Sequence, residues 1–231
     1  MSDATTGQSP LDLLSALAVE EVEAGPDLRH LEIFTMEGLL GIMWHGDRTA
    51  TDVVVAGGGG MGGFLGPAHG LYHDLGESLP AQGIGVMRVD YRRPSHLDRS
   101  LLDMAAAVDL AARAGAERFL FLGHSFGGAV AIQAALTVID YAAGVVTLAT
   151  QSAGCEHADR LGDMPLLLFH GDRDEILASD NSAMVQTIAG TGEVVIYPGA
   201  HHLLNEAADD LRGRLTTWIP EQFAHHAGRH T

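Results

Sequence analysis

The sequence predicts an α/β protein built around a mostly parallel sheet, and three observations carry this prediction. From about residue 52 onwards, short apolar runs alternate with longer segments of helical periodicity. These apolar runs lack in-and-out alternation, which is typical of strands that are buried on both faces. The chain has 231 residues, of which 46% are hydrophobic, and this suits one domain with a single substantial core.

The elements follow in order along the chain. Residues 11–24, "LDLLSALAVEEVEA", predict a short amphipathic helix. The runs "RHLEIFTM" and "LLGIMWH" flank Glu37 and Gly38 and predict a hairpin, which would add an antiparallel edge to the sheet. Further strands are expected at 52–56, 84–90, 117–123, 144–150, 165–170 and 193–197, giving about eight in total. Helices on both faces of the sheet are expected at about 64–80, 99–114, 126–139, 178–189 and 203–219.

The pattern divides the chain into three parts. We expect an N-terminal extension with the short helix at 1–28, one α/β domain at 29–223 and a flexible tail at 224–231. Only about a dozen residues separate the strand that ends near Thr150 from the one that starts near Pro165. The sequence therefore predicts no large cap domain.

Composition excludes several classes of function. A formal net charge of −17 disfavours binding to nucleic acid or to an anionic membrane surface. All 13 basic residues are Arg, which excludes a Schiff-base lysine, a phosphate-loop lysine and a Ser–Lys pair. Cys155 is the single cysteine, so neither an intramolecular disulfide nor a cysteine zinc site can form. With no long apolar run and no signal-like segment, we expect a soluble cytoplasmic protein.

The glycine run "VVVAGGGGMGGF", residues 53–64, has two interpretations at this point. It contains G-x-G-x-x-G, whose glycines let a backbone approach a pyrophosphate at a helix N-terminus. In a hydrolase, a loop in the same position directs backbone N–H groups at a developing oxyanion.

The stretch "FLFLGHSFGGAVAIQAAL", residues 119–136, predicts a nucleophile. An apolar strand runs into Gly123, Ser125 and Gly127 and continues directly into a helix. A serine at such a sharp turn needs a strained backbone, and a Cβ two residues before or after it would collide with the neighbouring chain. Ser125 would therefore project above the sheet at a helix N-terminus, which favours negative charge.

A serine nucleophile needs a base, and the base needs a group that orients it. The strand and loop "MPLLLFHGDRDEI", residues 164–176, supply Asp172, Asp174 and Glu175. The last strand and loop, "EVVIYPGAHHLLNEA" at residues 193–207, supply His201 and His202. Each group follows a separate strand, in the order serine, acid, histidine.

These motifs resemble those of the α/β-hydrolase superfamily over residues 29–223. The elbow is matched by "GHSFGG", the acid loop by "HGDRD" and the histidine loop by "PGAHH". The chain is similar to compact serine esterases without a lid, of the dienelactone-hydrolase kind. The resemblance implies Ser125 as nucleophile, Asp174 as acid and His202 as base, with Asp172 as the alternative acid and His201 as the alternative base.

The resemblance also decides between the two interpretations of the glycine run. It implies an oxyanion loop, with one donor at the N–H of Phe126 and the other at Gly58, or Gly59 as second choice. In this chain Ala56-Gly57 stands where the commonest family pattern has a His-Gly pair. A dinucleotide site fits poorly, because a hairpin precedes the run and Asp90 follows it by about 30 residues instead of about 20. Similar hydrolases have a structural Asp-Tyr-Arg at that point.

The predicted function is hydrolysis of a carboxylic ester with a small or short acyl group, through an acyl-serine intermediate. Thioester, amide or peptide cleavage and acyl transfer on the same triad remain alternatives, as does a non-catalytic scaffold that binds a partner. No cofactor and no metal are expected, and His69 and His73 are interpreted as ordinary polar residues. The expected partner is a small ester-like molecule, with a homodimer left open. Cys155 is expected to be an inert, partly buried thiol beside the pocket.

Overall fold

The computed structural model describes residues 8–229, and its centre is one nine-stranded sheet with the order β1-β2-β3-β5-β4-β6-β7-β8-β9. Strands β4 to β9 are parallel to one another, whereas β1, β2 and β3 add on as an antiparallel meander beside β5. The strands are β1 (Ala18–Gly25), β2 (Leu28–Thr35), β3 (Gly38–His45), β4 (Asp52–Gly57), β5 (Ile84–Asp90), β6 (Arg118–His124), β7 (Ala142–Leu148), β8 (Leu166–Gly171) and β9 (Glu193–Tyr197). The predicted α/β fold with a mostly parallel sheet is confirmed.

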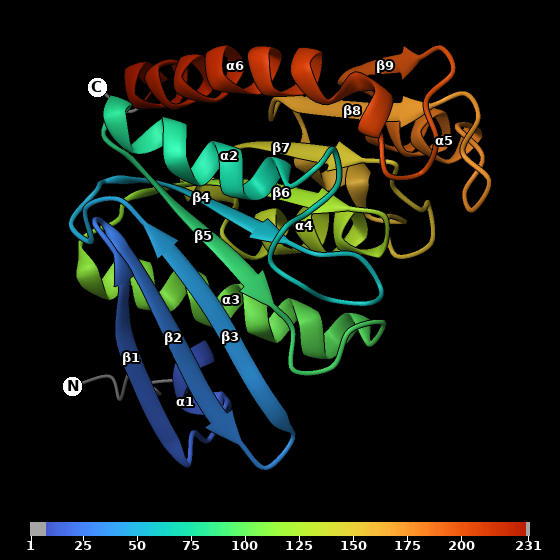
Figure 1. The fold of residues 1–231 in the computed structure, drawn as a ribbon. Coiled ribbons are helices and arrows are strands. Elements are labelled where there is room, and N and C mark those ends of the chain that lie inside the picture. Colours follow the sequence, from blue (N-terminus) through green and yellow to red (C-terminus); the bar gives the residue numbers. More distant parts are fainter. Residues whose placement is uncertain (1–7, 230–231) are drawn as a thin grey trace, which may run out of the picture.

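Helices cover both faces of this sheet (Figure 1). They are α1 (Pro10–Leu13), α2 (Leu71–Ser78), α3 (Leu97–Ala114), α4 (Phe126–Thr137), α5 (Asp180–Ala189) and α6 (Ala208–Arg229). Helices α2 and α6 pack on one face, and the others contribute to the apolar cluster on the opposite face. Strand β4 shows why both faces are apolar, because Val53 and Val55 belong to one cluster whereas Val54 and Ala56 belong to the other. No large cap domain interrupts the described chain.

The N-terminal part differs from the expectation. The helix predicted over residues 11–24 is wrong, because only Pro10–Leu13 is helical, with Ser9 and Asp12 forming a capping box. Residues Ala18–Gly25 instead pair antiparallel with β2 and form β1. Pairing with a neighbouring strand has overridden the helical pattern of this segment. Residues 18–25 therefore form a strand of the sheet instead of a separate extension, and the sheet has nine strands instead of about eight.

The C-terminal part also differs. The expected flexible tail at 224–231 is wrong as far as Arg229, because α6 continues to that residue and His226 is buried at 5% exposure. Pro220 lies inside this helix, where it removes one amide donor without ending the helix. Residues 230 and 231 lie outside the described part of the chain. The helix predicted from residue 64 begins only at Leu71, because the preceding residues form a loop.

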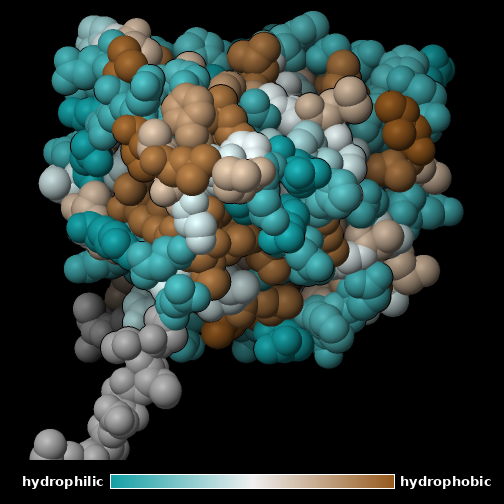
Figure 2. All heavy atoms as spheres, turned by 90° about the horizontal axis from the view of Figure 1, so that it is seen from below, coloured by the Kyte–Doolittle hydropathy of each residue, from teal (hydrophilic) through white to brown (hydrophobic). Residues whose placement is uncertain are grey.

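The face seen in Figure 2 carries a concentration of hydrophobic side chains. Val108 of α3 and Val138 line two adjoining hollows, of about 880 and 450 Å³. The larger hollow also touches Arg118 and Phe119, at the start of β6, so it lies at the opposite end of that strand from Ser125. Among the described residues, no helix is both long and apolar enough to cross a lipid bilayer.

A buried ion pair fastens the end of β5 to α3. The side chains of Arg92 and Asp103 are 1% and 0% exposed, and Arg92 Nε donates to Asp103 Oδ1 at 2.5 Å. The Arg92 amide donates to the other carboxylate oxygen at 2.9 Å. Burial raises the pKa of Asp103, and Arg92 opposes that shift because it stabilises the carboxylate.

We expect Asp103→Ala to lower the free energy of unfolding by about 3–5 kcal/mol, because it leaves the buried Arg92 charge with only the partly exposed Glu37 carboxylate, 3.4 Å away, as a partner. Urea denaturation followed by circular dichroism measures the change. Asp209→Ala is the matched control, because that carboxylate is paired with Arg212 but is 99% exposed, so its loss should leave stability nearly unchanged. Equal stability of the wild type and Asp103→Ala would contradict a structural role for the pair.

Candidate active site

The turn between β6 and α4 holds Ser125 in a strained conformation. Its φ and ψ are 55° and −119°, a combination that side-chain-bearing residues rarely adopt. The Ser125 amide donates to Leu148 O of β7 at 2.8 Å, which fixes the turn against the neighbouring strand. The side chain is partly exposed at the N-terminus of α4. The structure therefore gives Ser125 the position that the sequence predicts for it.

Glycines on both sides of Ser125 allow this turn to form without steric overlap. A Cβ at Gly123 would overlap the carbonyl oxygen of Gly127, and a Cβ at Gly127 would overlap the carbonyl oxygens of Gly57 and Gly58. The predicted collisions on both sides of Ser125 are thus confirmed. The second collision also shows that the turn lies directly against the end of β4.

The acid loop after β8 holds Asp174 with four hydrogen bonds. Its Oδ1 accepts from the amides of Ile176 and Leu177, both at 2.8 Å. Its Oδ2 accepts from His202 Nδ1 at 2.7 Å and from His170 Nε2 at 3.1 Å. Burial would raise the pKa of Asp174, but the hydrogen bonds from Leu177, His202 and Ile176 outweigh burial and lower it. Asp174 is therefore a buried carboxylate at neutral pH.

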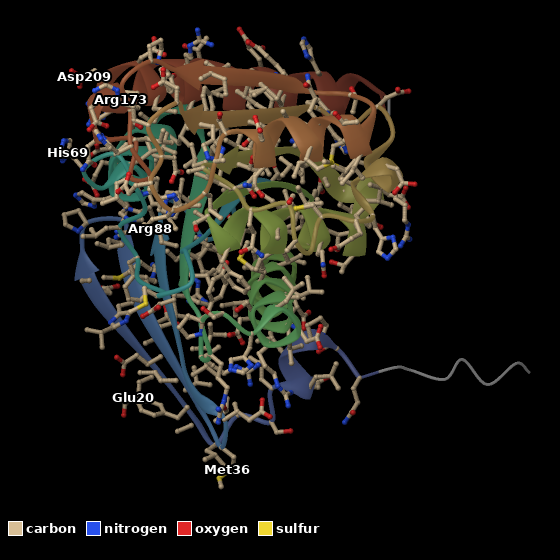
Figure 3. The ribbon with its side chains drawn as sticks, turned by 90° about the vertical axis from the view of Figure 1, so that its right-hand side faces the viewer. Glu20, Met36, His69, Arg88, Arg173 and Asp209 are labelled. Carbon is tan, nitrogen blue, oxygen red and sulfur yellow. The ribbon has the colours of Figure 1, made fainter. Side chains whose placement is uncertain are left out.

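The histidine loop after β9 brings His202 to this carboxylate. The ring is buried at 7% exposure, and its Nδ1–H donates to Asp174, which leaves Nε2 as the nitrogen that can accept a proton. The close approach of the two loops depends on Gly171, because a Cβ there would overlap the carbonyl oxygen of Ala200. Figure 3 looks onto this edge of the sheet, with Arg173 of the acid loop and His69 of the loop before α2 labelled on the same side of the view.

Asp172 and His201, the alternative acid and the alternative base, form hydrogen bonds within the loops. Asp172 is exposed and accepts a hydrogen bond from the amide of Gly199 at 2.6 Å, which ties the acid loop to the histidine loop. His201 is half exposed, and its Nδ1 lies 2.9 Å from Glu206 Oε1. That hydrogen bond from His201 lowers the pKa of Glu206 to about 2. Neither alternative residue shares a hydrogen bond with Asp174 or His202.

Two further histidines belong to the site, and the sequence assigned neither of them a role. His124, immediately before Ser125, donates from Nε2 to the carbonyl oxygen of His202 at 3.0 Å, and the two ring centroids are 4.8 Å apart. Burial lowers the pKa of His124 to about 4, so this ring is neutral at pH 7. His170 is fully buried, with Nδ1 2.7 Å from the Ser182 hydroxyl and Nε2 3.0 Å from Leu177 O. Both lie inside the quoted motifs, but only the fold shows what they contact.

His124 also connects His202 to the turn at Ser125, because it contacts His202 and precedes Ser125. Within the described residues, no hydrogen bond joins the Ser125 hydroxyl to the His202 ring. In free enzymes that contact is commonly long and shortens when substrate binds.

The glycine loop lies beside Ser125. A Cβ at Gly59 would lie 3.6 Å from Ser125 Cβ, whereas one at Gly58 would press on the carbonyl groups of Gly62 and Gly63. Asp90 accepts a hydrogen bond from the amide of Gly63 at 2.6 Å and so anchors the loop.

Tyr91 and Arg92 complete the structural Asp-Tyr-Arg that the resemblance implied. The Tyr91 hydroxyl occupies the space that a side chain at Gly57 would need. Arg92 forms the buried ion pair described above. The three residues therefore fix the loop and the end of β5 without reaching the hollow at Ser125.

A hollow of about 460 Å³ opens over the serine. It is bounded by the glycine loop, the residues after Asp90, the segment after β7 and the acid loop. Its lining residues are Gly60, Ser95, Leu97, Ser125, Phe126, Gln151, Ala153, Gly154, Ile176 and Leu177. Cys155 is fully buried beneath this surface instead of lining it, and burial raises the pKa of its thiol to about 12.

A separate group of possible metal ligands lies between β3 and α2. The ligand atoms of His45, His73 and Glu77 all lie within 4.8 Å of one another. Burial, with smaller contributions from Arg88 and His73, lowers the pKa of His45 to about 4. The sequence gave His73 no ligand set, because His45 comes from a strand 28 residues earlier in the chain.

Comparison with known proteins identifies the family. The model of the phospholipase/carboxylesterase family matches residues 97–219, which is just over half of the chain and includes the elbow, the acid loop and the histidine loop. The chain belongs to this family. It is therefore an α/β-hydrolase and a carboxylic ester hydrolase, as predicted. A search of curated proteins returned no match.

Solved structures share the fold of this carboxylesterase at low sequence identity. Est1E from Butyrivibrio proteoclasticus is 17% identical with a TM-score of 0.68, and the match covers 84% of this chain and 99% of Est1E. A CIB-like hydrolase from Thermoplasma acidophilum is 15% identical with a TM-score of 0.68, over 85% and 100% of the two chains. An α/β serine hydrolase homologue from Coxiella burnetii is 20% identical with a TM-score of 0.66, over 85% and 98%.

We expect Gly127→Ala to destabilise this carboxylesterase by about 3 kcal/mol, because the added methyl group meets backbone carbonyl groups that cannot move aside. Thermal and urea unfolding measure the change. Gly213→Ala is the matched control, because Gly213 lies in α6 with open space around it, so alanine should stabilise the helix by about 0.5–1 kcal/mol. The same effect in both variants would refute the close contact at the elbow.

Proposed function

We propose that this carboxylesterase cleaves esters of small or short-acyl substrates with Ser125 as nucleophile, His202 as general base and Asp174 as the residue that orients it. The observation that carries the proposal is the 2.7 Å hydrogen bond from His202 Nδ1 to a buried Asp174, formed beside the strained turn that presents Ser125. A carboxylate held in this way keeps the imidazole in the tautomer whose Nε2 can take a proton.

The first half of the reaction forms the acyl-enzyme. Ser125 Oγ attacks the carbonyl carbon of the ester while His202 Nε2 takes the hydroxyl proton, so that the carbonyl oxygen becomes an oxyanion. The tetrahedral intermediate then collapses, the bond to the alcohol oxygen breaks, and His202 returns the proton to that oxygen. The alcohol leaves, and the acyl group remains on Ser125.

The second half repeats these steps with water. His202 takes a proton from the water as its oxygen attacks the acyl-serine carbonyl, and it then protonates Ser125 Oγ as the acid departs. The positive imidazolium that forms twice in this cycle is stabilised by Asp174. The enzyme returns to its starting state with one ester bond hydrolysed.

Backbone donors stabilise the oxyanion in this proposal. The amide of Phe126 is the first of α4, and amides in the first turn of a helix have no acceptor within the helix. The second donor is an amide of the glycine loop at Gly58 or Gly59, and the closeness of Gly59 to Ser125 Cβ supports the latter. Each such donor is typically worth about 3–4 kcal/mol in the transition state.

The hollow over Ser125 supports a small substrate. Leu97, Phe126 and Leu177 supply apolar surface at its rim, and Ile176 is 66% exposed beside them. A short acyl chain or the end of a larger molecule can be covered by these side chains, whereas a long chain would remain in water. A cytoplasmic location stays a prediction.

Fluorophosphonate labelling tests the nucleophile directly. We expect the wild type to be labelled at one site, Ser125→Ala to be unlabelled and His202→Ala to be labelled far more slowly. A folded wild type that takes no label would contradict an activated serine. Hydrolysis of matched acetyl and octanoyl esters, a thioester and an amide then ranks the acyl groups and the bond types.

Steady-state kinetics on a short-chain ester separate the residues of the proposed triad from their neighbours. We expect kcat to fall about 10⁶-fold in Ser125→Ala or His202→Ala and about 10⁴-fold in Asp174→Asn. The neighbouring variants His201→Ala and Asp172→Asn are the controls and should keep most of the activity. A larger loss in either control than in its triad counterpart would move the role to that neighbour.

His170 is proposed as a positioning residue for Asp174. Its Nε2 lies within reach of two acceptors, Asp174 Oδ2 and Leu177 O, so it carries a proton that it shares between them. We expect His170→Met to lower kcat about 10²-fold with little change in KM, because Asp174 loses one of the contacts that orient it. His170→Gln should restore most of the activity, because its amide N–H can occupy the place of Nε2. Equal activity in both variants, measured after their folding is checked by circular dichroism, would exclude this role.

A further inference from the structure

The cluster of His45, His73 and Glu77 lies outside the catalytic machinery and joins two parts of the fold. His45 is the last residue of β3, where it pairs with Val86 near the start of β5. His73 and Glu77 are four residues apart on α2, so they lie one turn apart on the same face of that helix. One buried strand residue and two exposed helix residues thus converge on a common point.

The distances within the cluster fit a small transition-metal ion. Two ligand atoms at about 2.0–2.1 Å from a tetrahedral zinc ion are about 3.3 Å apart. His45 Nδ1 and Glu77 Oε1 are 3.3 Å apart, so this pair already has the spacing of two zinc ligands. The His45 and His73 ring centroids are 6.0 Å apart, and the exposed His73 side chain can rotate to supply the third ligand.

The packing around His45 holds its ring in place. A Cβ at Gly76 would lie 2.7–2.8 Å from three atoms of the His45 ring, so the imidazole rests directly on the backbone of α2. Glycine inside a helix costs about 1 kcal/mol relative to alanine. The helix therefore carries a destabilising residue at the one place where the imidazole needs the space.

We propose that His45, His73 and Glu77 bind a zinc ion that clamps β3 to α2. Two imidazoles and one carboxylate are donors that Zn²⁺ accepts, with a water molecule as fourth ligand. The clamp would fasten the antiparallel meander of β1, β2 and β3 to a helix of the parallel part, so its expected effect is on stability. It lies apart from the loops that hold Ser125, and it differs from the expectation that the protein has no metal site.

Arg88 opposes a cation at this place. Its guanidinium, labelled in Figure 3, extends from β5 and interacts electrostatically with both His45 and Glu77. The Glu77 carboxylate offsets that charge. We therefore expect weaker binding than at a four-ligand structural zinc site.

Competition with a chromophoric zinc chelator tests the proposal. The wild type is compared with His73→Ala and Glu77→Gln, both exposed positions on a helix, and with the controls His225→Ala and Glu221→Gln, exposed positions on α6. We expect the first two variants to bind zinc at least tenfold more weakly than the wild type, and both controls to match the wild type. Zinc should also raise the Tm of the wild type but not of His73→Ala.

Two results would overturn the proposal. One is zinc binding by His73→Ala and Glu77→Gln that equals the wild type. The other is loss of zinc binding in His225→Ala. That result would mean that the zinc ion binds adventitiously to surface histidines near the C-terminus. Zinc-edge anomalous scattering from crystals should show one peak beside His45. Fluorophosphonate labelling of Ser125 should be unchanged by chelators, so this test succeeds or fails separately from the esterase proposal.

Discussion

The contact between the nucleophile turn and the end of β4 is the constraint on which the rest of the site depends. Gly127 lies against the carbonyl groups of Gly57 and Gly58, and Gly123 lies against Gly127 itself. With side chains at these glycines, α4 could not begin immediately after β6, and Ser125 would not be held at a positive φ. The same contact places the glycine loop next to the serine. One steric requirement therefore positions both the proposed nucleophile and the loop proposed to stabilise its oxyanion.

The order of the strands brings the remaining groups to this turn. Strands β6, β7, β8 and β9 are adjacent and parallel, so the loops that follow them open at one edge of the sheet. Asp174 follows β8 and His202 follows β9. Hydrogen bonds between the loops after these two strands hold the two side chains close together. The Arg173 amide donates to Ala200 O at 3.0 Å, and Gly199 donates to Asp172. Asp172, the alternative acid, thus contributes one of the hydrogen bonds that join the acid loop to the histidine loop.

The sequence predicted the parts of the fold whose burial is uniform. Strands β4 to β8 are apolar on both faces, and their positions follow from that pattern alone. Strand β1 was missed because all of its residues are exposed, so no alternation of buried and exposed positions marks it as a strand, and its three glutamates favour a helix. The candidate site residues lie in short local motifs that can be recognised in the sequence, whereas the contacts of His124 and His170 arise only when separate loops meet. The cluster of His45 with His73 could not be foreseen for the same reason.

The glycine run shows how one local pattern can serve two chemistries and how its surroundings choose between them. A phosphate-binding loop needs free amides that lead directly into a helix. Here the Gly63 amide donates to Asp90, whose carboxylate would repel a pyrophosphate, and α2 begins only at Leu71 after a further loop. Tyr91 fills the space beside Gly57, and Tyr72 donates a hydrogen bond to Gly57 O at 2.9 Å. The side chains of Asp90, Tyr91 and Tyr72 therefore hold the glycine loop in place, and Gly59 of this loop lies next to Ser125. That arrangement suits a small oxyanion formed on the serine, and no helix begins directly after the glycine run to bind a phosphate.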